Sequence, residues 1–331
     1  MKDTNKLAIV IAGNFTDGEN NADPYILLNY LPEEMAKKCE FIEWSTQPSS
    51  HYSMSLMLDL TNMFETLIEQ NYSGIIVISG SGVLEEMAYM TDLLWKHDEP
   101  LIYANLLVRN CDGKREGLMN FKSSVIAALS EQTKGKGVLV CTSAELHEAS
   151  DVAMFDPISP ENAFYSPRKT CIGKIINDEV IYFREAKRPN FLVRRPEKLL
   201  NVELLWASMG GGDTIISVAH NSRKIDGFVL VGFGTGNVPP TWVPNILNII
   251  RASIPVAIVS RCPCGNLQEN NDYEGGYQRL IEMGVISGGT LNAYQARIKM
   301  ILGLSVGLTR EGLELYMQNK SVSEDIPELY N

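Results

Sequence analysis

The sequence IIVISGSGVLEEMA, from Ile75 to Ala88, predicts a strand, a tight turn and a helix in immediate succession. The short β-branched run Ile75–Ile78 is typical of a buried parallel strand, and Leu84–Trp95 has the length and composition of a helix. The glycine- and serine-rich turn between them presents backbone N–H groups and hydroxyls at the positive end of the helix. In an open α/β sheet, such a turn after a strand predicts a ligand site.

The same alternation of strand-like and helix-like runs extends along the first half of the chain. It is typical of a doubly wound α/β domain, in which functional residues gather on loops at the carboxyl ends of the strands. The expected strands are Leu7–Ala12, Phe41–Trp44, Ile75–Ile78, Leu101–Tyr103 and Val138–Cys141, and the expected helices are Glu33–Cys39, Ser53–Asn71, Leu84–Trp95 and Met119–Leu129.

A change of pattern marks the division into two domains. Residues 151–195 are turn-rich, with Asn177-Asp178 placed as a β-hairpin turn, and a charged, proline-bearing segment follows at Arg194–Lys198. Alternation then resumes. We expect a larger N-terminal domain over residues 1–195, a linker at 196–201 and a smaller C-terminal α/β domain over 202–331. In the latter we expect strands at Glu203–Ala207, Gly227–Val231 and Val256–Ser260, with helices at Asp213–Asn221, Trp242–Ala252, Gln278–Met283 and Ala293–Leu304.

The composition and charge of the chain argue against some classes of function. The 331 residues carry 29 basic and 40 acidic side chains, a net charge of −11, with no long block of like charge. This balance argues against nucleic acid and favours a protein that handles small molecules. No signal peptide or membrane span is evident, so we expect a cytoplasmic protein with no membrane partner. The six cysteines are expected to be reduced, and Cys262-Pro263-Cys264 lacks the second ligand pair that a zinc site needs. We expect no metal and no cofactor.

Several motifs together resemble the L-asparaginase family, in its cytoplasmic type I-like branch. Ser79–Ala88 resembles the second signature of that family, H/T-G-T-D-T-M-E-E-T-A, and other matches follow in order over nearly the whole chain. The resemblance implies an asparaginase-like α/β fold, a small-molecule amide or amino-acid-like ligand, and a homodimer or homotetramer in which a partner completes each site. The further matching segments are Pro48–Tyr52 (D-S-S-x-M), Glu116–Phe121 (D-G-x-x-N-L, opening a helix), Asn162–Pro167 (D-A-F-x-S-P), Gly232–Pro239 (G-x-G-x-G-N-x-P) and Gly284–Leu291 (A-G-V-I-G-G-D-M-T).

The positions that carry chemistry in that family are altered here. The first signature, T-G-G-T-I, corresponds to Ala12–Thr16, so the position of the threonine nucleophile holds Asn14 or Phe15, with Thr16 one or two residues further on. The Thr-Asp pair of the second signature corresponds to Ser81-Gly82, which keeps a hydroxyl and loses the carboxylate. Met154 or Phe155 stands where the resemblance expects a lysine. Losing lysine and aspartate together avoids an uncompensated buried charge, which costs about 3–5 kcal/mol, but it also removes the means of activating a hydroxyl.

Each remaining candidate residue has a structural alternative. Tyr25 resembles a lid tyrosine or simply starts a helix, and Ser49 and Ser50 resemble a substrate loop or form an ordinary turn. Asn237 resembles an asparagine that reaches a neighbouring subunit's site, and its alternative is an amide that caps a glycine-rich turn. Glu274 has a similar, weaker resemblance. Asn14, Gly80 and Gly82 complete the expected binding site. Glu85 and Glu86 are expected on a solvated helix face, and no histidine has the spacing of a triad.

Three functions stay open. The first is a divergent amidohydrolase or acyl-transfer enzyme that uses Thr16 or Ser81, acts on an Asn-, Gln- or Asp-like amide, and is poor on free L-asparagine. The second is a catalytically inactive homologue that binds a small ligand or regulates a partner. The third, an ordinary asparaginase with Thr16 shifted into place, ranks last because it lacks the lysine and aspartate that activate the hydroxyl.

Overall fold

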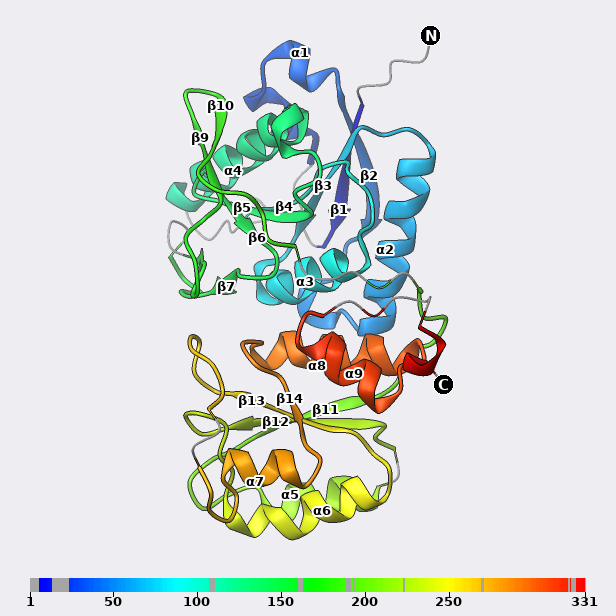
Figure 1. Cartoon of the computed structure of the whole chain (residues 1–331). Helices are drawn as coiled ribbons and strands as arrows, with labels where there is room; N and C mark the ends of the chain where they lie inside the picture. Colours follow the sequence, from blue (N-terminus) through cyan, green and yellow to red (C-terminus); the bar gives the residue numbers. More distant parts are fainter. Residues whose placement is uncertain are drawn as a thin grey trace. The chain divides into compact units, whose positions relative to one another are not determined.

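The computed structural model describes residues 6–13, 24–106, 111–159, 163–188, 192, 194–222, 224–268, 271–320, 322 and 326–330, with the backbone alone at 111–116, 220 and 327. The chain forms two compact units, Met1–Phe191 and Leu192–Asn331 (Figure 1). Each unit has its own sheet and its own apolar core. Within the described ranges, no helix is both long and apolar enough to cross a membrane.

The first unit is built on a mixed sheet, which has eight strands among the described residues in the order β10-β9-β6-β5-β4-β3-β1-β2. The five strands from β1 to β5 are parallel, and the last three are antiparallel to their neighbours. The strands are β1 (Leu7–Ala12), β2 (Cys39–Ser45), β3 (Gly74–Ser79), β4 (Leu101–Asn105), β5 (Val138–Thr142), β6 (Glu145–Glu148), β9 (Gly173–Ile176) and β10 (Glu179–Tyr182), and a separate pair joins β7 (Ala153–Met154) to β8 (Phe164–Tyr165).

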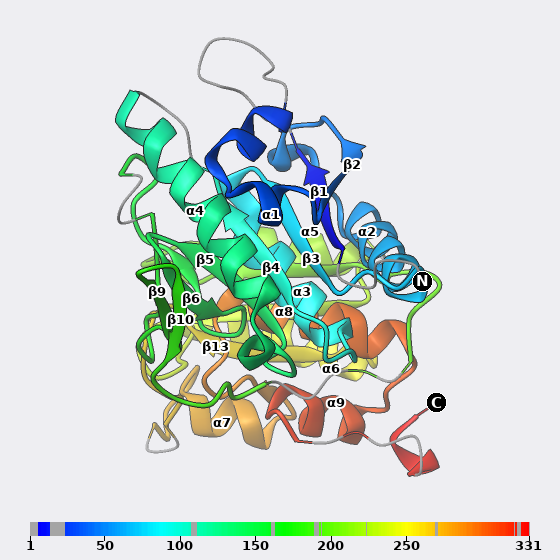
Figure 2. The ribbon, with the colours of Figure 1, turned by 90° about the horizontal axis from the view of Figure 1, so that it is seen from above.

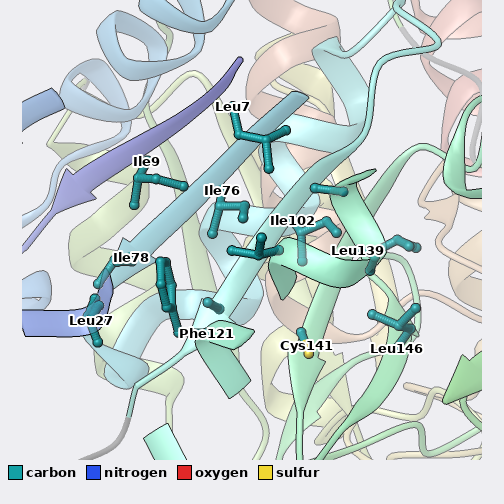
Figure 3. Packing of buried hydrophobic residues seen from close by; sticks show 14 of the residues in the cluster. Leu7, Ile9, Leu27, Ile76, Ile78, Ile102, Phe121, Leu139, Cys141 and Leu146 are labelled. Carbon is teal, nitrogen blue, oxygen red and sulfur yellow. The ribbon is translucent and has the colours of Figure 1, made fainter. Parts of the chain in front are cut away.

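Helices cover both faces of this sheet. On one face, alternate residues of the strands form a core with Phe121 and Val125 of α4 (Figure 3), and α4 lies across the central strands (Figure 2). On the opposite face, the hydroxyl of Tyr103 in β4 forms a 2.7 Å hydrogen bond with the hydroxyl of Thr91 in α3. The helices are α1 (Glu33–Ala36), α2 (Met54–Glu69), α3 (Leu84–Leu94) and α4 (Cys111–Leu129), with 3-10 helices η1 (Pro24–Tyr30), η2 (Ser49–His51), η3 (Ser81–Val83) and η4 (Glu131–Thr133).

The second unit is a smaller parallel α/β unit. Its described strands lie in the order β11-β12-β13-β14 and are all parallel. Their core includes Trp242, Ile246 and Phe228, each fully or almost fully buried. The elements are β11 (Val202–Trp206), β12 (Gly227–Gly232), β13 (Val256–Ser260) and β14 (Ile286–Ser287), with α5 (Asp213–Asn221), η5 (Pro240–Trp242), α6 (Val243–Arg251), α7 (Tyr277–Glu282), α8 (Ala293–Ser305), α9 (Arg310–Met317) and η6 (Pro327–Leu329).

The expected fold class is confirmed, with a larger mixed-sheet unit followed by a smaller parallel α/β unit. The hairpin turn is confirmed too: Asn177 and Asp178 have φ values of 51° and 62°, as a two-residue type I′ turn requires. The expectation that Glu116-Gly117 opens a helix is wrong. The helix α4 begins at Cys111, so both residues lie inside it.

Candidate functional site

The candidate site lies where the order of the parallel strands reverses. Because β1 is between β2 and β3, the chain leaves the ends of β1 and β3 in opposite directions, which opens a crevice in folds of this order. Ala12, Ser79 and Asn105 lie abreast at the carboxyl ends of β1, β3 and β4. The turn Gly80–Gly82 then leads into α3, so the turn singled out in the sequence does stand at this reversal.

Gly13 allows the ends of β1 and β3 to approach. Its φ of +150° disfavours side chains, and a Cβ on it would lie 3.2 Å from the backbone nitrogen of Gly80. Ser49, in the loop after β2, is buried against the same turn: a Cβ on Gly80 would lie 2.5 Å from Ser49 Oγ, and one on Gly82 would lie 3.7 Å from it. The fold thus brings Ser49, Gly80 and Gly82 together, with Ser81 half-buried in the turn itself.

Ser50 differs from Ser49 in being exposed. Both belong to η2, which is followed by Ser53, whose hydroxyl accepts a 3.1 Å hydrogen bond from Leu56 N at the start of α2. That cap fixes where α2 begins, directly after the loop that carries the two serines. Asn14 and Thr16 lie outside the described residues.

A neutral polar floor, which sequence reasoning missed, underlies the turn. We give this name to Ser79, Asn105 and Thr142, which end β3, β4 and β5 and share the sheet face that carries α3. Asn105 Nδ2 donates to Thr142 Oγ1 over 3.3 Å. Ser79 Oγ and Asn105 Oδ1 are buried and find no hydrogen-bond partner among the described residues. A buried polar atom without a partner costs about 1–3 kcal/mol, so two of them beside a candidate site point to a ligand or solvent group that pairs with them.

Glu85, in the first turn of α3, is not on a solvated face as expected. It is half-buried, and its Oε2 accepts a 2.8 Å hydrogen bond from the backbone nitrogen of Met154 at the end of β7. Burial raises the pKa of Glu85, the bond from Met154 opposes that rise, and the charge of Glu86 adds to it. A carboxylate therefore stands against the backbone of Met154, whose own side chain is apolar.

Tyr25 lies in η1 and is 56% exposed. The ring centroid is 4.9 Å from that of Phe41, a β2 residue in register with Ile9. Ile9 belongs to the core under α4, so Tyr25 packs on the sheet face opposite to the one that carries Ser79.

Asn237 and Glu274 belong to the second unit. Asn237 Oδ1 accepts hydrogen bonds from Asn271 Nδ2 at 3.0 Å and from Tyr277 N at 3.1 Å, so its amide oxygen fixes the glycine-rich loop and the start of α7. This is the capping role that the sequence offered as the alternative for Asn237. Glu274 is exposed.

His147 contacts two side chains, Ser166 and Glu145, which its spacing in the sequence did not suggest as a catalytic set. Its Nδ1 is 2.8 Å from Ser166 Oγ and its Nε2 is 3.4 Å from Glu145 Oε2. Hydrogen bonding from His147 and Lys174 outweighs burial and lowers the pKa of Glu145 to about 2. His147 is only 2% exposed and lies on β6, which is inside the sheet between β5 and β9, opposite Val140 of β5. We interpret these contacts as a structural link between β6 and Ser166, the residue that follows β8, and not as a reaction centre.

Comparison with known proteins agrees with this architecture. Residues 11–188 match the family model described as asparaginase, N-terminal, and residues 201–317 match the glutaminase/asparaginase C-terminal domain. A probable L-asparaginase of Deinococcus radiodurans is 28% identical over 274 residues, covering 80% of this chain and 81% of its own length. An L-asparaginase of Bacillus licheniformis is 26% identical, covering 78% of this chain and 80% of its own.

A solved structure of a probable cytoplasmic L-asparaginase from Campylobacter jejuni superposes with a TM-score of 0.84 at 21% identity, covering 95% of this chain and 99% of that one. At 21% identity, this similarity shows a shared fold and nothing about activity. The two family models together span both units, in the order that the fold requires. The chain therefore belongs to the asparaginase family of amidohydrolases, which act on carbon–nitrogen amide bonds.

Proposed function

We propose that this chain is a divergent amidohydrolase or acyl-transfer enzyme that acts on an Asn-, Gln- or Asp-like amide in a small molecule and is poor on free L-asparagine. The observation that carries the proposal is the neutral polar floor beneath the Ser81 turn. Ser79 Oγ and Asn105 Oδ1 are buried there without partners among the described residues. Such groups suit an uncharged amide, with which they can exchange hydrogen bonds.

The preference against free asparagine follows from charge. An α-ammonium group needs a carboxylate or several acceptors to replace the water it loses, and an unpaired buried charge is expensive. Gly82 stands where the family signature has aspartate, and Met154 where it has lysine. The nearby carboxylate of Glu85 already accepts the Met154 N–H. A substrate whose α-amino group is acylated or absent avoids the ammonium altogether.

The hydroxyl that attacks is proposed to be that of Ser81 or Thr16. Ser81 is half-buried in the turn that precedes α3. The first N–H groups of that helix and its dipole favour an oxyanion, so they would aid both an alkoxide and a tetrahedral intermediate. A non-standard nucleophile without a paired lysine is expected to be slow relative to the named relatives.

The experiment is ammonia release by the purified protein from free asparagine, free glutamine, and a panel of N-acylated and cyclic amides. Ser81→Ala and Thr16→Ala are tested beside Ser55→Ala, a matched change at an exposed serine of α2. Release from a blocked amide that one of the first two variants abolishes, and Ser55→Ala keeps, supports the proposal and names the nucleophile. Release that survives both variants would contradict it.

A catalytically inactive homologue is the second candidate. The replacements at Gly82 and Met154 favour it as much as they favour a retuned enzyme, because both describe a site without activating charges. It would bind a small ligand, or regulate a partner, without converting anything. Calorimetric binding of an amide that is recovered unchanged, with no ammonia from any substrate, would favour this reading.

The assembly and location are proposals as well. A homodimer or homotetramer is proposed from family membership, with Asn237 and Glu274 as the residues that approach a neighbour's site. A cytoplasmic location is proposed from the sequence. Similar proteins include both a probable cytoplasmic enzyme and a probable periplasmic L-asparaginase of Haemophilus influenzae.

A further inference from the structure

The pair Cys262 and Cys264 follows β13 on an exposed loop at the carboxyl end of the second sheet. Both residues are reduced and exposed, and the backbone bends at every residue from 261 to 265. Fully extended, two residues span roughly 6.6–7.2 Å between Cα atoms, whereas a disulfide needs roughly 4.4–6.8 Å. A bent segment therefore brings the pair toward the spacing of a disulfide. Gly265 has a φ of +100° with no atom within 4 Å of a Cβ built on it, so the loop has room to adjust.

The other cysteines with described side chains are poorly suited to thiol chemistry. Burial raises the pKa of Cys39 to about 11 and also raises that of Cys171. Cys141 is 0% exposed in the core of the first sheet. The thiolate is the reactive form and must be reached by its partner, so reactivity among these residues concentrates at positions 262 and 264.

We propose that Cys262 and Cys264 form a thiol–disulfide exchange site for small-molecule disulfides of the glutathione class. One cysteine thiolate attacks a sulfur of the small disulfide, forming a mixed disulfide and releasing the first small thiol. The second cysteine thiolate attacks the protein sulfur of that mixed disulfide, closing the Cys262–Cys264 bond and releasing the second small thiol. The pair loses two protons and two electrons, and the small disulfide takes them up.

The closed form is readily reversible. A disulfide between residues two apart closes a small, strained ring, and strained or exposed disulfides are the more easily reduced ones. Excess reduced thiol of the same class therefore reopens it. The pair acts as a reporter of the ratio of small disulfide to small thiol, and it does not stabilise the fold.

The neighbouring glycine-rich loop senses the change. Cys262 N donates to Ser260 Oγ over 2.9 Å, and Ser260 Oγ donates in turn to the carbonyl of Gly234 over 2.5 Å. Arg261 N donates to Gly232 O over 3.0 Å, and its guanidinium lies 5.0 Å from the centre of the Phe233 ring. Ring closure reorients the Cys262 N–H, which loosens the Ser260 bridge to the loop that carries Asn237.

The test uses the full chain incubated with oxidised glutathione and then with an excess of the reduced form. Intact mass and alkylation should show the loss of two hydrogen atoms at a peptide containing both cysteines, restored on reduction. Cys262→Ser and Cys264→Ser should each stop at a single glutathione adduct, whereas Cys39→Ser should behave as the unchanged protein. A pair that stays fully alkylatable, or single variants without any adduct, would overturn the proposal.

Hydrogen exchange tests the coupling in the same samples. Amides of Phe233, Gly236 and Asn237, which are bonded within the loop, should exchange at least about twofold faster in the oxidised protein. The two single variants, treated identically, should show no such difference between their oxidised and reduced samples because they cannot close the ring. Unchanged exchange in a protein that has formed the disulfide would overturn the link to the glycine-rich loop.

Discussion

Position 80 is where the candidate site has the least room for a side chain. A Cβ there would meet Ser49 Oγ at 2.5 Å and Ser49 Cβ at 3.0 Å, whereas a Cβ on Gly82 meets only Ser49 Oγ, at 3.7 Å. The hydroxyl can rotate away, but the Cβ of Ser49 is one bond from its backbone and cannot. The approach of two loops, and not a special backbone angle, therefore requires glycine at position 80.

Gly80→Ala is expected to lose about 1–3 kcal/mol of unfolding free energy through this overlap. Gly82→Ala should stay within about 0.5 kcal/mol, as exposed substitutions without a special feature usually do. Urea unfolding of the two variants measures both values. Equal stabilities for the two alanine variants would show that Ser49 does not pack against the turn.

Glu85 is expected to stabilise the first unit through its bond to Met154 N. Glu85→Ala leaves that N–H without its acceptor and should lose about 1–2 kcal/mol, whereas Glu85→Gln keeps an acceptor oxygen and should recover most of the loss. Thermal or urea unfolding separates the three proteins. If glutamine is as harmful as alanine, the negative charge, and not the hydrogen bond, is what the site needs.

The sequence could point to Ser49, Gly80 and Ser81 because each sits in a contiguous loop with a recognisable pattern. It could not point to Ser79 and Asn105, which are 26 positions apart and become neighbours only through the register of β3 and β4. Glu85 was misjudged for a similar reason: its partner Met154 is 69 residues away. A local sequence pattern can therefore predict a turn, whereas contacts between residues on different strands can be known only once the fold is known.

At the scale of elements, buried strands and regular helices were the predictable parts. The strand Leu7–Ala12 and the helix Asp213–Asn221 match the expected bounds to the residue. The strand β6 was missed because two of its inward positions, Glu145 and His147, are polar and paired with each other, which hides the apolar alternation. The helix α9 was missed although Thr309, whose hydroxyl accepts from Gly312 N, is a detectable start signal.

A fully buried lysine, Lys299 of α8, lies at the contact between α8 and α9. Lys299 is 0% exposed, and its Nζ donates to the carbonyl of Tyr316 at 2.5 Å and to Asn319 Oδ1 at 2.6 Å. Burial lowers the pKa of Lys299 to about 7 from 10.5. Between those two values the unfolded chain binds a proton that the folded chain does not hold, so the stability of the fold should rise with pH across this window.

Lys299→Met removes the titratable amine, so the dependence of the unfolding free energy on pH should become weaker. Comparing pH 7 with pH 10, the gain in unfolding free energy should be smaller in the variant than in the unchanged protein by at least about 1 kcal/mol. Lys320→Met, at an exposed position, should leave the dependence as it is. Urea titrations at several pH values provide the comparison, and parallel curves for all three proteins would show that Lys299 is charged equally in both states.

At the scale of the whole molecule, the chain forms two units with separate apolar cores. The linker expected at residues 196–201 stays a prediction.

The second unit exposes several large apolar side chains at the end of β11, just after it, and along α5. They are Trp206, Met209, Ile215 and Val218, with Met209 97% exposed. Several large apolar side chains exposed on one unit favour a surface that another chain covers.

Light scattering of the purified protein should therefore report about two or four times the 36.8 kDa of one chain. The proposed oligomer buries apolar surface, so its dissociation should need dilution or denaturant. A stable species of a single chain's mass at micromolar concentration would contradict the proposed assembly, and with it the role of Asn237 and Glu274 at a shared site.

The central claim is that this member of the asparaginase family has a neutral site that suits an amide without an α-ammonium group. The most direct measurement is the rate of ammonia release from free L-asparagine and from its N-acetyl derivative, at equal concentrations and with Ser81→Ala and Thr16→Ala in parallel. The account predicts release from the acetylated compound, little or none from asparagine, and loss of release in one variant. Turnover of free asparagine at roughly 1–1000 per second, the common range for enzymes, would contradict it.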